Sequence, residues 1–412
     1  MRIWIIWWWA SGMAISSFLS EMDLWWNEVY LIEKNDCLGK KVLITWWWRC
    51  NLSNALKNRK EYLSKYIRWW DLVFSLFEKF SPKKTLARFE NNWLKLKIED
   101  NFRVFPVSDK SQDVVRIFER NIARNNKINV RFWQQIEDIK LNNNKFLVNT
   151  NTENYEFDCL VIATWWNAYS KTWSSWDGYY FARQLWHHVT KLSPSLTSFD
   201  IVEGFFGDIS GIQFENAWIV FWNQKINWSL IFTHDGISGP LTFALSAYLA
   251  HEIINEKNKL KIKFIPNSSN TYEFYNSQIQ ELINIGPTKQ LKNVLVELLP
   301  KRFVSDILPK YSIDINKTWA NFSKEERKKL CHLLSEWLEI TLIWRKNWDE
   351  FVTAWWVSLD EINYDSMESK LVKNLYFAWE ILDVDAVTWW FNLQFCWSGA
   401  RVIADNITKS CI

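Results

Sequence analysis

The chain has 412 residues, enough for two or three domains and a large core. Its 49 Lys and Arg residues against 46 Asp and Glu residues give a formal net charge of +3. No dense Lys/Arg block appears, which argues against nucleic acid as a partner. The six cysteines form no C-x-x-C pair, so we expect a cytoplasmic protein without structural zinc.

Two residue counts depart from ordinary usage. The chain has 10 glycines and 31 tryptophans, whereas glycine alone averages about 7% of residues in proteins. The tryptophans form runs at 7–9 and 46–48 and pairs at 165–166, 355–356 and 389–390, where turns are expected. A large aromatic side chain suits neither a positive φ nor a close approach to a ligand. We therefore interpret many of these positions as former glycine positions.

The first segment has the pattern strand, turn, helix, strand. Arg2–Ile6 and Val29–Ile32 are apolar, and a helical face of small and apolar residues lies between them. With glycine restored at 7 and 9, the turn would be G-x-G-x-x-G ending at Gly12, with Glu33 following 21 positions later (33 minus 12). That spacing is typical of a carboxylate on an adenosine ribose, with the pyrophosphate at the helix N-terminus.

Two other interpretations of this segment stay open. Residues 3–19 carry no charge, as in a secretory signal or membrane anchor. The stretch is only as long as the shortest spanning helix, and no cleavage-type linker follows, so we expect no membrane association. A buried βαβ unit without a ligand is the second interpretation.

The remaining chain predicts an insertion into an α/β domain. Residues 155–166 form an apolar strand and turn, residues 191–265 are β-rich with strands at 212–221 and 260–266, and residues 272–340 are helical. A capping box, Ser323–Glu326, precedes an apolar helical stripe that continues to Leu338. The α/β character returns after about residue 345.

The histidines give weak signals. His234, Asp235 and Ser238 in "THDGISGP" are too close in sequence for a hydrolytic triad. His234 is the single weak catalytic candidate, and we favour a structural turn histidine there. His187 and His188 lack metal-ligand spacing and are expected at an exposed helix end, so we predict no metal site.

Several long stretches resemble the HI0933-like (BaiN/YhiN) family of NAD(P)/FAD-dependent oxidoreductases. They include "IEKNDCLGKKVLIT", "RCNLSNA", "NFRVFPVSDKSQDVV", "FDCLVIAT", "FTHDGISGP", "SLDEINYDSMESKLVKNLYFA", "EILDVDAVT" and "FNLQFCWSGARVIA". The resemblance covers nearly the whole chain. It implies a Rossmann-type FAD-binding domain in two pieces, 1–190 and 345–412, with an inserted β-rich domain at 191–270 and an inserted helical domain at 271–344.

The resemblance also implies the cofactor site. Its residues would be Ser11, Gly12, Glu33, Lys34, Lys40, Thr45, Arg49, Cys50, Asn51, Ala163, Thr164, Asp383, Asn392 and Gln394. Glu33 would accept a ribose hydroxyl, Arg49 and Asn51 would donate to the flavin or its phosphates, and Asp383 would meet the ribityl chain. The family has glycine at 7, 8, 9, 46, 48, 165, 166, 355, 356, 379, 389 and 390, where this chain has tryptophan.

The expected function is that of an FAD-dependent oxidoreductase acting on a small molecule, with NAD(P)H as electron donor. Because tryptophan replaces the turn glycines, we expect this chain to bind FAD weakly and to fold poorly. The alternative is a tryptophan-rich protein that binds a membrane interface or glycans. The tryptophan runs at strand–helix junctions favour the first interpretation over interfacial binding. Oligomeric state and substrate do not follow from the sequence.

Overall fold

The fold begins with a strand because Arg2–Trp7 is a run of apolar, mostly β-branched or aromatic residues (β1). The structure, a computed structural model, describes residues 1–7, 10–44, 48–164, 177–190, 193–266, 271–335, 338–345, 352–354 and 357–410. It separates into two compact units, residues 1–193 with 351–412 and residues 194–350. The finer division into three domains stays a prediction.

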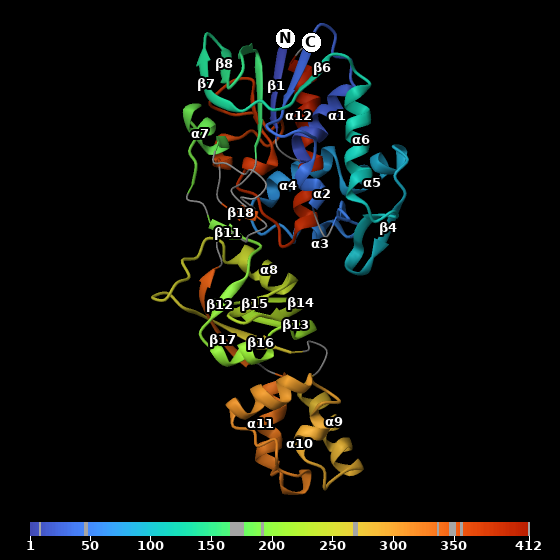
Figure 1. The fold of residues 1–412 in the computed structure, drawn as a ribbon, viewed down its shortest axis with the longest axis vertical. Helices are drawn as coiled ribbons and strands as arrows, with labels where there is room; N and C mark the ends of the chain where they lie inside the picture. The colour runs from blue at the N-terminus through green and yellow to red at the C-terminus, as the bar shows by residue number, and fades with distance from the viewer. Residues whose placement is uncertain are drawn as a thin grey trace. The chain divides into compact units, whose positions relative to one another are not determined.

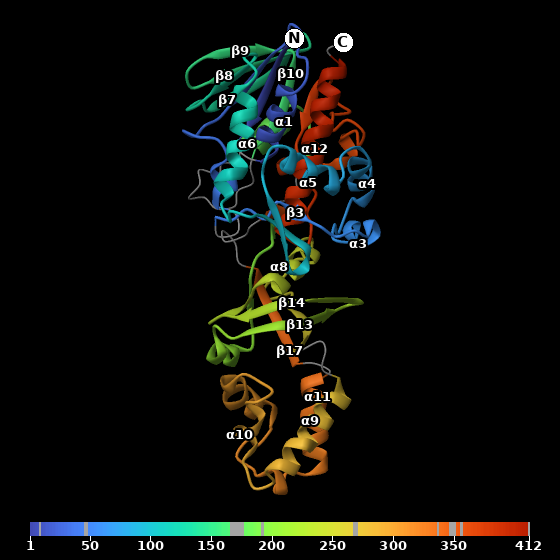
Figure 2. The same ribbon diagram turned by 90° about the vertical axis from the view of Figure 1, so that its right-hand side faces the viewer.

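A five-stranded parallel sheet organises the first unit (Figures 1 and 2). Its order is β19-β10-β1-β2-β6, with each neighbouring pair parallel. The other four strands are β2 (Glu28–Ile32), β6 (Ile128–Arg131), β10 (Cys159–Ala163) and β19 (Leu375–Phe377). The side chains of β10 are all buried, as expected for a central parallel strand covered on both faces.

Helices from both ends of the chain cover this sheet. α1 (Ala10–Ser20) packs against α12 (Trp389–Ser410) and α6 (Ser111–Ala123), and Figure 1 shows α1 beside α12. This packing joins the two sequence pieces of the unit around one core. Shorter helices complete it: α2 (Lys40–Ile44), α3 (Arg59–Leu63), α4 (Trp70–Lys79), α5 (Pro82–Asn91) and α7 (Asp177–Gln184).

Two small antiparallel sheets extend the first unit. One has the order β3-β5-β4 and the other the order β7-β8-β9. Their strands are β3 (Ser53–Asn54), β4 (Leu96–Glu99), β5 (Arg103–Pro106), β7 (Ile136–Asn142), β8 (Lys145–Thr150) and β9 (Asn154–Phe157). The expected single strand at 155–166 is therefore two strands in different sheets. The strand is interrupted at Asp158, whose carboxylate accepts a hydrogen bond from the Arg2 amide at 2.7 Å.

A closed barrel forms the β-rich part of the second unit. Its order is β12-β15-β14-β13-β16-β17. The strands are β12 (Phe199–Ile201), β13 (Gln213–Phe221), β14 (Gln224–Phe232), β15 (Gly236–Ser238), β16 (Leu260–Ile265) and β17 (Leu338–Arg345). The strands expected at 212–221 and 260–266 are confirmed as β13 and β16. Short strands β11 (Ser193–Ser195) and β18 (Val352–Ala354) lie near the points where the chain passes between units.

Helices α8 (Pro240–Tyr248), α9 (Tyr272–Ile285), α10 (Leu291–Leu295) and α11 (Lys324–Ser335) complete this unit. The capping box before α11 is confirmed, because the Glu326 amide donates to Ser323 Oγ at 3.1 Å and the Ser323 amide donates to Glu326 Oε2 at 2.9 Å. The expected extension of the helical stripe to Leu338 is wrong. Leu338 begins β17, where the alternating β-branched run pairs with β16 and closes the barrel.

Within the described residues, no helix combines the length and the apolar character needed to cross a membrane. The five cysteines that the described residues contain form no disulfide bonds.

Candidate functional site

The candidate site is built where the parallel strands β1, β2 and β10 end. The carboxyl ends of neighbouring parallel strands lie at one edge of a sheet, and ligands of such folds bind there. α1 begins at Ala10, directly after the end of β1, so its N-terminus faces the same edge. Ser11 and Gly12 lie in its first turn and are buried. Residues 8, 9 and Thr45 lie outside the described residues.

Glu33 follows the last residue of β2 and is 1% exposed. Its Oε1 accepts hydrogen bonds from the amide and the side-chain nitrogen of Asn35, both at 2.7 Å. Burial raises the pKa of the Glu33 carboxyl from 4.5 to about 7, although the hydrogen bonds from Asn35 lower it. A buried carboxyl group at this edge is the acceptor that a ribose hydroxyl needs. The structure places Glu33 at the carboxyl end of β2, and its role as a ribose acceptor stays a prediction.

The two lysines expected near Glu33 differ in their surroundings. Lys40, at the start of α2, forms an ion pair with Asp36 at 2.8 Å, and this contact raises the pKa of Lys40. Both side chains of the pair are about half exposed. Lys34 follows Glu33 directly and is half-buried.

The guanidinium group of Arg49 is held by contacts within the protein. Its guanidinium forms ion pairs with Glu99 and, at 2.6 Å, with Asp109, and it lies 4.1 Å from the centre of the Phe105 ring. These contacts lower the pKa values of both carboxyl groups, with the Arg49 hydrogen bond as the largest cause at Glu99 and that of Lys97 at Asp109. The charge of Arg49 is therefore already compensated before any cofactor binds.

Buried polar groups without partners lie on several predicted site residues. Asn51 is fully buried, and neither its side-chain oxygen nor its nitrogen has a hydrogen-bond partner within the described part of the chain. The same holds for Thr164 Oγ1 and Asn392 Nδ2. Burying an unpaired polar group costs about 1–3 kcal/mol, so such atoms indicate a missing polar ligand. These side chains fit the requirements of a bound FAD.

Thr164 directly follows Ala163, the last residue of β10, and packs against α7. A Cβ at Gly178 would lie 1.8 Å from Thr164 Oγ1, so only glycine fits at this position of the helix. The glycine holds the helix backbone against the strand end that carries Thr164.

The last helix contributes the third group of predicted residues. Asn392 Oδ1 accepts a hydrogen bond from the Ala386 amide at 2.8 Å and so holds the loop before α12. Asp383 lies in this loop, is 7% exposed, and accepts from the Trp69 indole at 3.4 Å. Gln394 instead points into the core, where its amide bonds Ser53, Thr85 and Ser398 at 2.7–3.0 Å.

Sequence reasoning missed the ion pair between Arg68 and Asp385, which anchors the same loop; the Asp385 side chain is only 2% exposed. Asp385 is the second aspartate of "LDVDAVT", and this motif was the only hint of the ion pair in the sequence. Its partner Arg68 lies 317 residues away.

Buried indoles occupy two positions around this loop where the resemblance predicts glycine. Trp379 is 2% exposed, and its Nε1 donates to the Val384 carbonyl at 2.8 Å. Trp390, in the first turn of α12, is 4% exposed. These rings take up volume beside the predicted cofactor residues.

The histidines lie elsewhere. His234 is exposed in the turn between β14 and β15, in the second unit. His187 is buried rather than at an exposed helix end, because α7 already ends at Gln184. Its Nε2 lies 2.8 Å from Ser369 Oγ, and burial lowers the pKa of its ring.

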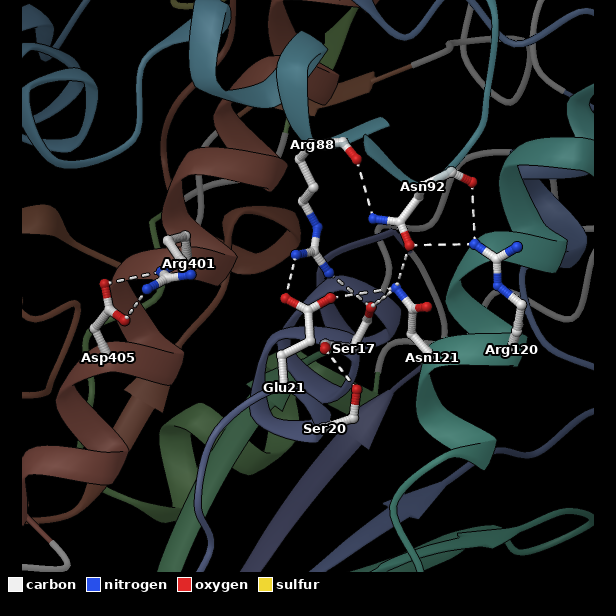
Figure 3. Close-up of polar contacts among 9 residues, drawn as sticks. All are labelled: Ser17, Ser20, Glu21, Arg88, Asn92, Arg120, Asn121, Arg401 and Asp405. Atoms are coloured by element: carbon white, nitrogen blue, oxygen red, sulfur yellow. Dashed lines mark hydrogen bonds and ion pairs between the residues drawn. The ribbon is translucent and has the colours of Figure 1, made fainter. Parts of the chain in front are cut away.

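A cavity of about 550 Å³ lies at the opposite end of α1, between α1, α5 and α12. Figure 3 shows its charged rim. Arg88 forms an ion pair with Glu21 at 2.5 Å, Arg401 pairs with Asp405 at 2.9 Å, and both guanidinium groups lie over the Phe18 ring. Both arginines have internal partners, so their charges are already compensated, and the cofactor site at the strand ends stays a prediction.

Comparison with known proteins shows what this chain is similar to. A 3-dehydro-bile acid delta(4,6)-reductase of Clostridium scindens is 24% identical over 418 residues, covering 96% of each chain. A ribosomal RNA dihydrouridine synthase of Haemophilus influenzae is 25% identical over 414 residues, covering 97% of this chain and 96% of that protein. Among solved structures, a variant of the Escherichia coli quinol fumarate reductase subunit FrdA has a TM-score of 0.49 at 10% identity, covering 100% of this chain and 70% of that chain. The model of the HI0933-like protein Rossmann domain matches residues 3–406, and the chain belongs to this FAD-binding family.

Proposed function

We propose that this protein is an FAD-dependent reductase that uses NAD(P)H to reduce a carbon–carbon double bond conjugated to a carbonyl group in a small molecule. The family supports the FAD-dependent oxidoreductase class. The single observation that carries the cofactor assignment is the buried carboxyl group of Glu33 at the end of β2. FAD, when bound, supplies the hydride chemistry, and the protein orients the reactants.

The substrate class rests on what two relatives have in common. One is named as a 3-dehydro-bile acid delta(4,6)-reductase and the other as a ribosomal RNA dihydrouridine synthase. Both names describe a double bond in conjugation with a carbonyl group, in a steroid or in a uracil ring. Its reduction adds a hydride at the carbon remote from the carbonyl group and a proton at the adjacent carbon.

Charge favours a small molecule over RNA for this chain. Its net charge is +3 over 412 residues, whereas RNA-binding domains usually present a strongly basic face. We also propose a cytoplasmic location, which the lack of disulfide bonds among the described cysteines supports.

We further propose that the chain with tryptophan at 7–9, 46, 48, 165–166 and 389–390 binds FAD weakly. A pyrophosphate approaches backbone N–H groups closely only where the turn has no side chains. The buried indoles of Trp379 and Trp390 support a crowded site.

The test compares Glu33→Gln with Glu28→Gln in a chain that carries glycine at these tryptophan positions. Glu28 lies on the same strand but is exposed. Loss of a hydrogen bond to a charged group costs about 1.5–3 kcal/mol, so Glu33→Gln should weaken FAD binding roughly 10- to 100-fold, and Glu28→Gln should not. Equal affinities would contradict the role of Glu33.

The substrate is tested anaerobically with the reduced, FAD-loaded protein. We expect reoxidation of the flavin by a 3-oxo-Δ4 bile acid or a similar enone. Reoxidation by a ribosomal RNA transcript and not by enones would replace the small-molecule proposal with an RNA substrate. Failure of NADH and NADPH to reduce the flavin would refute the nicotinamide donor.

A further inference from the structure

Tryptophan is the most frequent side chain at left-handed backbone positions of this protein. Seventeen non-glycine residues in the described ranges have positive φ, and seven of them are tryptophans with φ between 46° and 70°. They are Trp25, Trp48, Trp69, Trp93, Trp133, Trp186 and Trp222. Left-handed positions ordinarily hold glycine, followed by asparagine and aspartate, because a Cβ crowds the backbone there.

Two of these tryptophans end helices in a glycine-specific motif. After α5, the Trp93 amide donates to the Glu90 carbonyl at 2.9 Å and the Leu94 amide to the Phe89 carbonyl at 3.1 Å. After α7, the Trp186 amide donates to Arg183 at 3.0 Å and the His187 amide to Ala182 at 3.0 Å. Both pairs of bonds define a Schellman motif, in which the left-handed residue is usually glycine.

A third tryptophan occupies a tight hairpin. Phe221 and Gln224 pair across the β13–β14 hairpin, so its loop is Trp222 and Asn223. Two-residue hairpin loops favour turns that need positive φ and are rich in glycine and asparagine.

Six of the seven indoles gain little packing that would offset this conformation, whereas Trp69 is half-buried and donates to Asp383 at 3.4 Å. Six of the seven side chains are 58–88% exposed, namely Trp25, Trp48, Trp93, Trp133, Trp186 and Trp222. A buried aromatic side chain, by contrast, contributes through contact area. The positive φ and the exposure of the side chain at these positions are therefore typical of positions that hold glycine.

We infer that the organism that carries this gene places glycine at these seven positions, by reading a UGA triplet as glycine. UGA differs by one base from the glycine triplet GGA and by one base from the tryptophan triplet UGG. One reassigned triplet accounts for scattered turns and contiguous runs alike. Glycine at the seven positions raises the glycine count from 10 to 17 (10 plus 7) of 412 residues, closer to the average of about 7%.

Buried tryptophans with specific contacts do not by themselves carry this inference. Trp397 stacks on Phe118 at 5.5 Å, and its Nε1 donates to the Leu52 carbonyl at 2.9 Å. Whether such a position holds tryptophan or glycine depends on the nucleotide triplet that encodes it.

The first test is the nucleotide sequence of the gene at the seven positions. We expect UGA at each. UGG at these positions would overturn the inference outright.

The second test is mass spectrometry of the protein purified from its own organism. Trypsin releases residues 89–95 (FENNWLK) and 132–140 (FWQQIEDIK), which contain Trp93 and Trp133, and residues 104–110 (VFPVSDK), which contain no tryptophan. We expect the first two peptides at the masses of their glycine forms and the third at its mass as written. Peptides that retain the indole mass would show that tryptophan is the natural residue. Neither test depends on the cofactor or the reaction.

Discussion

Glu33 makes the stability of the fold depend on pH. Its folded-state pKa of about 7 exceeds the unfolded value of 4.5, so between these values the folded protein holds more protons than the unfolded chain. The free energy of unfolding therefore falls as pH rises from 4.5 to 7, by about 3 kcal/mol for this group. We expect Glu33→Gln to flatten this decline in denaturant titrations. The control, Glu28→Gln at the exposed first residue of β2, should keep it.

Adjacent tryptophans offer a matched test of backbone strain. Trp25 has φ 48° and is 59% exposed, whereas Trp26 is 93% exposed and does not adopt a positive φ. Trp25→Gly relieves the left-handed strain and should raise the free energy of unfolding by about 1 kcal/mol. Trp26→Gly only loosens the unfolded chain and should lower it by up to about 1 kcal/mol. Urea unfolding of both variants checks the opposite signs, and equal shifts would refute the strain argument.

At the scale of elements, α12 is held by a buried polar network. Gln394 is fully buried and bonds Ser53, Thr85 and Ser398. Gln394→Leu removes three buried hydrogen bonds, and each loss costs about 0.5–1.5 kcal/mol because the hydroxyl groups keep other partners. We expect the thermal midpoint to fall sharply. The exposed Lys409 at the end of the same helix provides the control, because Lys409→Ala removes no buried contact.

The sequence predicts elements that depend on local pattern, but not contacts between distant parts of the chain. Hydrophobic runs predicted β1, β2, β13 and β16 because local periodicity determines strands. Glu33 was predictable from its place directly after a strand. The contacts of Arg49 with Glu99 and of Gln394 with Ser53 were not, because these partners lie 50 and 341 residues away in sequence. β17 was missed because its strand character depends on pairing with β16 to close the barrel.

At the scale of the whole molecule, the second unit should fold without the first. Residues 194–350 are continuous in sequence, and all six barrel strands belong to them. We expect this segment, expressed alone, to show β-rich circular dichroism and a cooperative thermal transition. A chain shortened to end at residue 335 is the control, because it lacks β17 and cannot close the barrel. Cooperative unfolding of the shortened segment would contradict the dependence on closure.

The tryptophans set the stability and cofactor binding of the whole chain through different positions. A non-glycine residue in the left-handed region costs roughly 1–2 kcal/mol, so the seven left-handed tryptophans together cost about 10 kcal/mol, comparable to a typical folding free energy of about 5–15 kcal/mol. Glycine at 25, 93, 133, 186 and 222, away from the expected cofactor turns, should therefore raise the thermal midpoint without restoring FAD. Glycine at 7, 8, 9, 46, 48, 165, 166, 389 and 390 should restore stoichiometric FAD, because it opens the turns that the pyrophosphate and flavin approach.

Flavin absorbance after desalting and a thermal melt separate the effects of the two sets of substitutions. A yellow, cooperatively unfolding protein with every tryptophan in place would refute the steric argument, and a colourless protein with all these glycines and added FAD would refute the cofactor assignment.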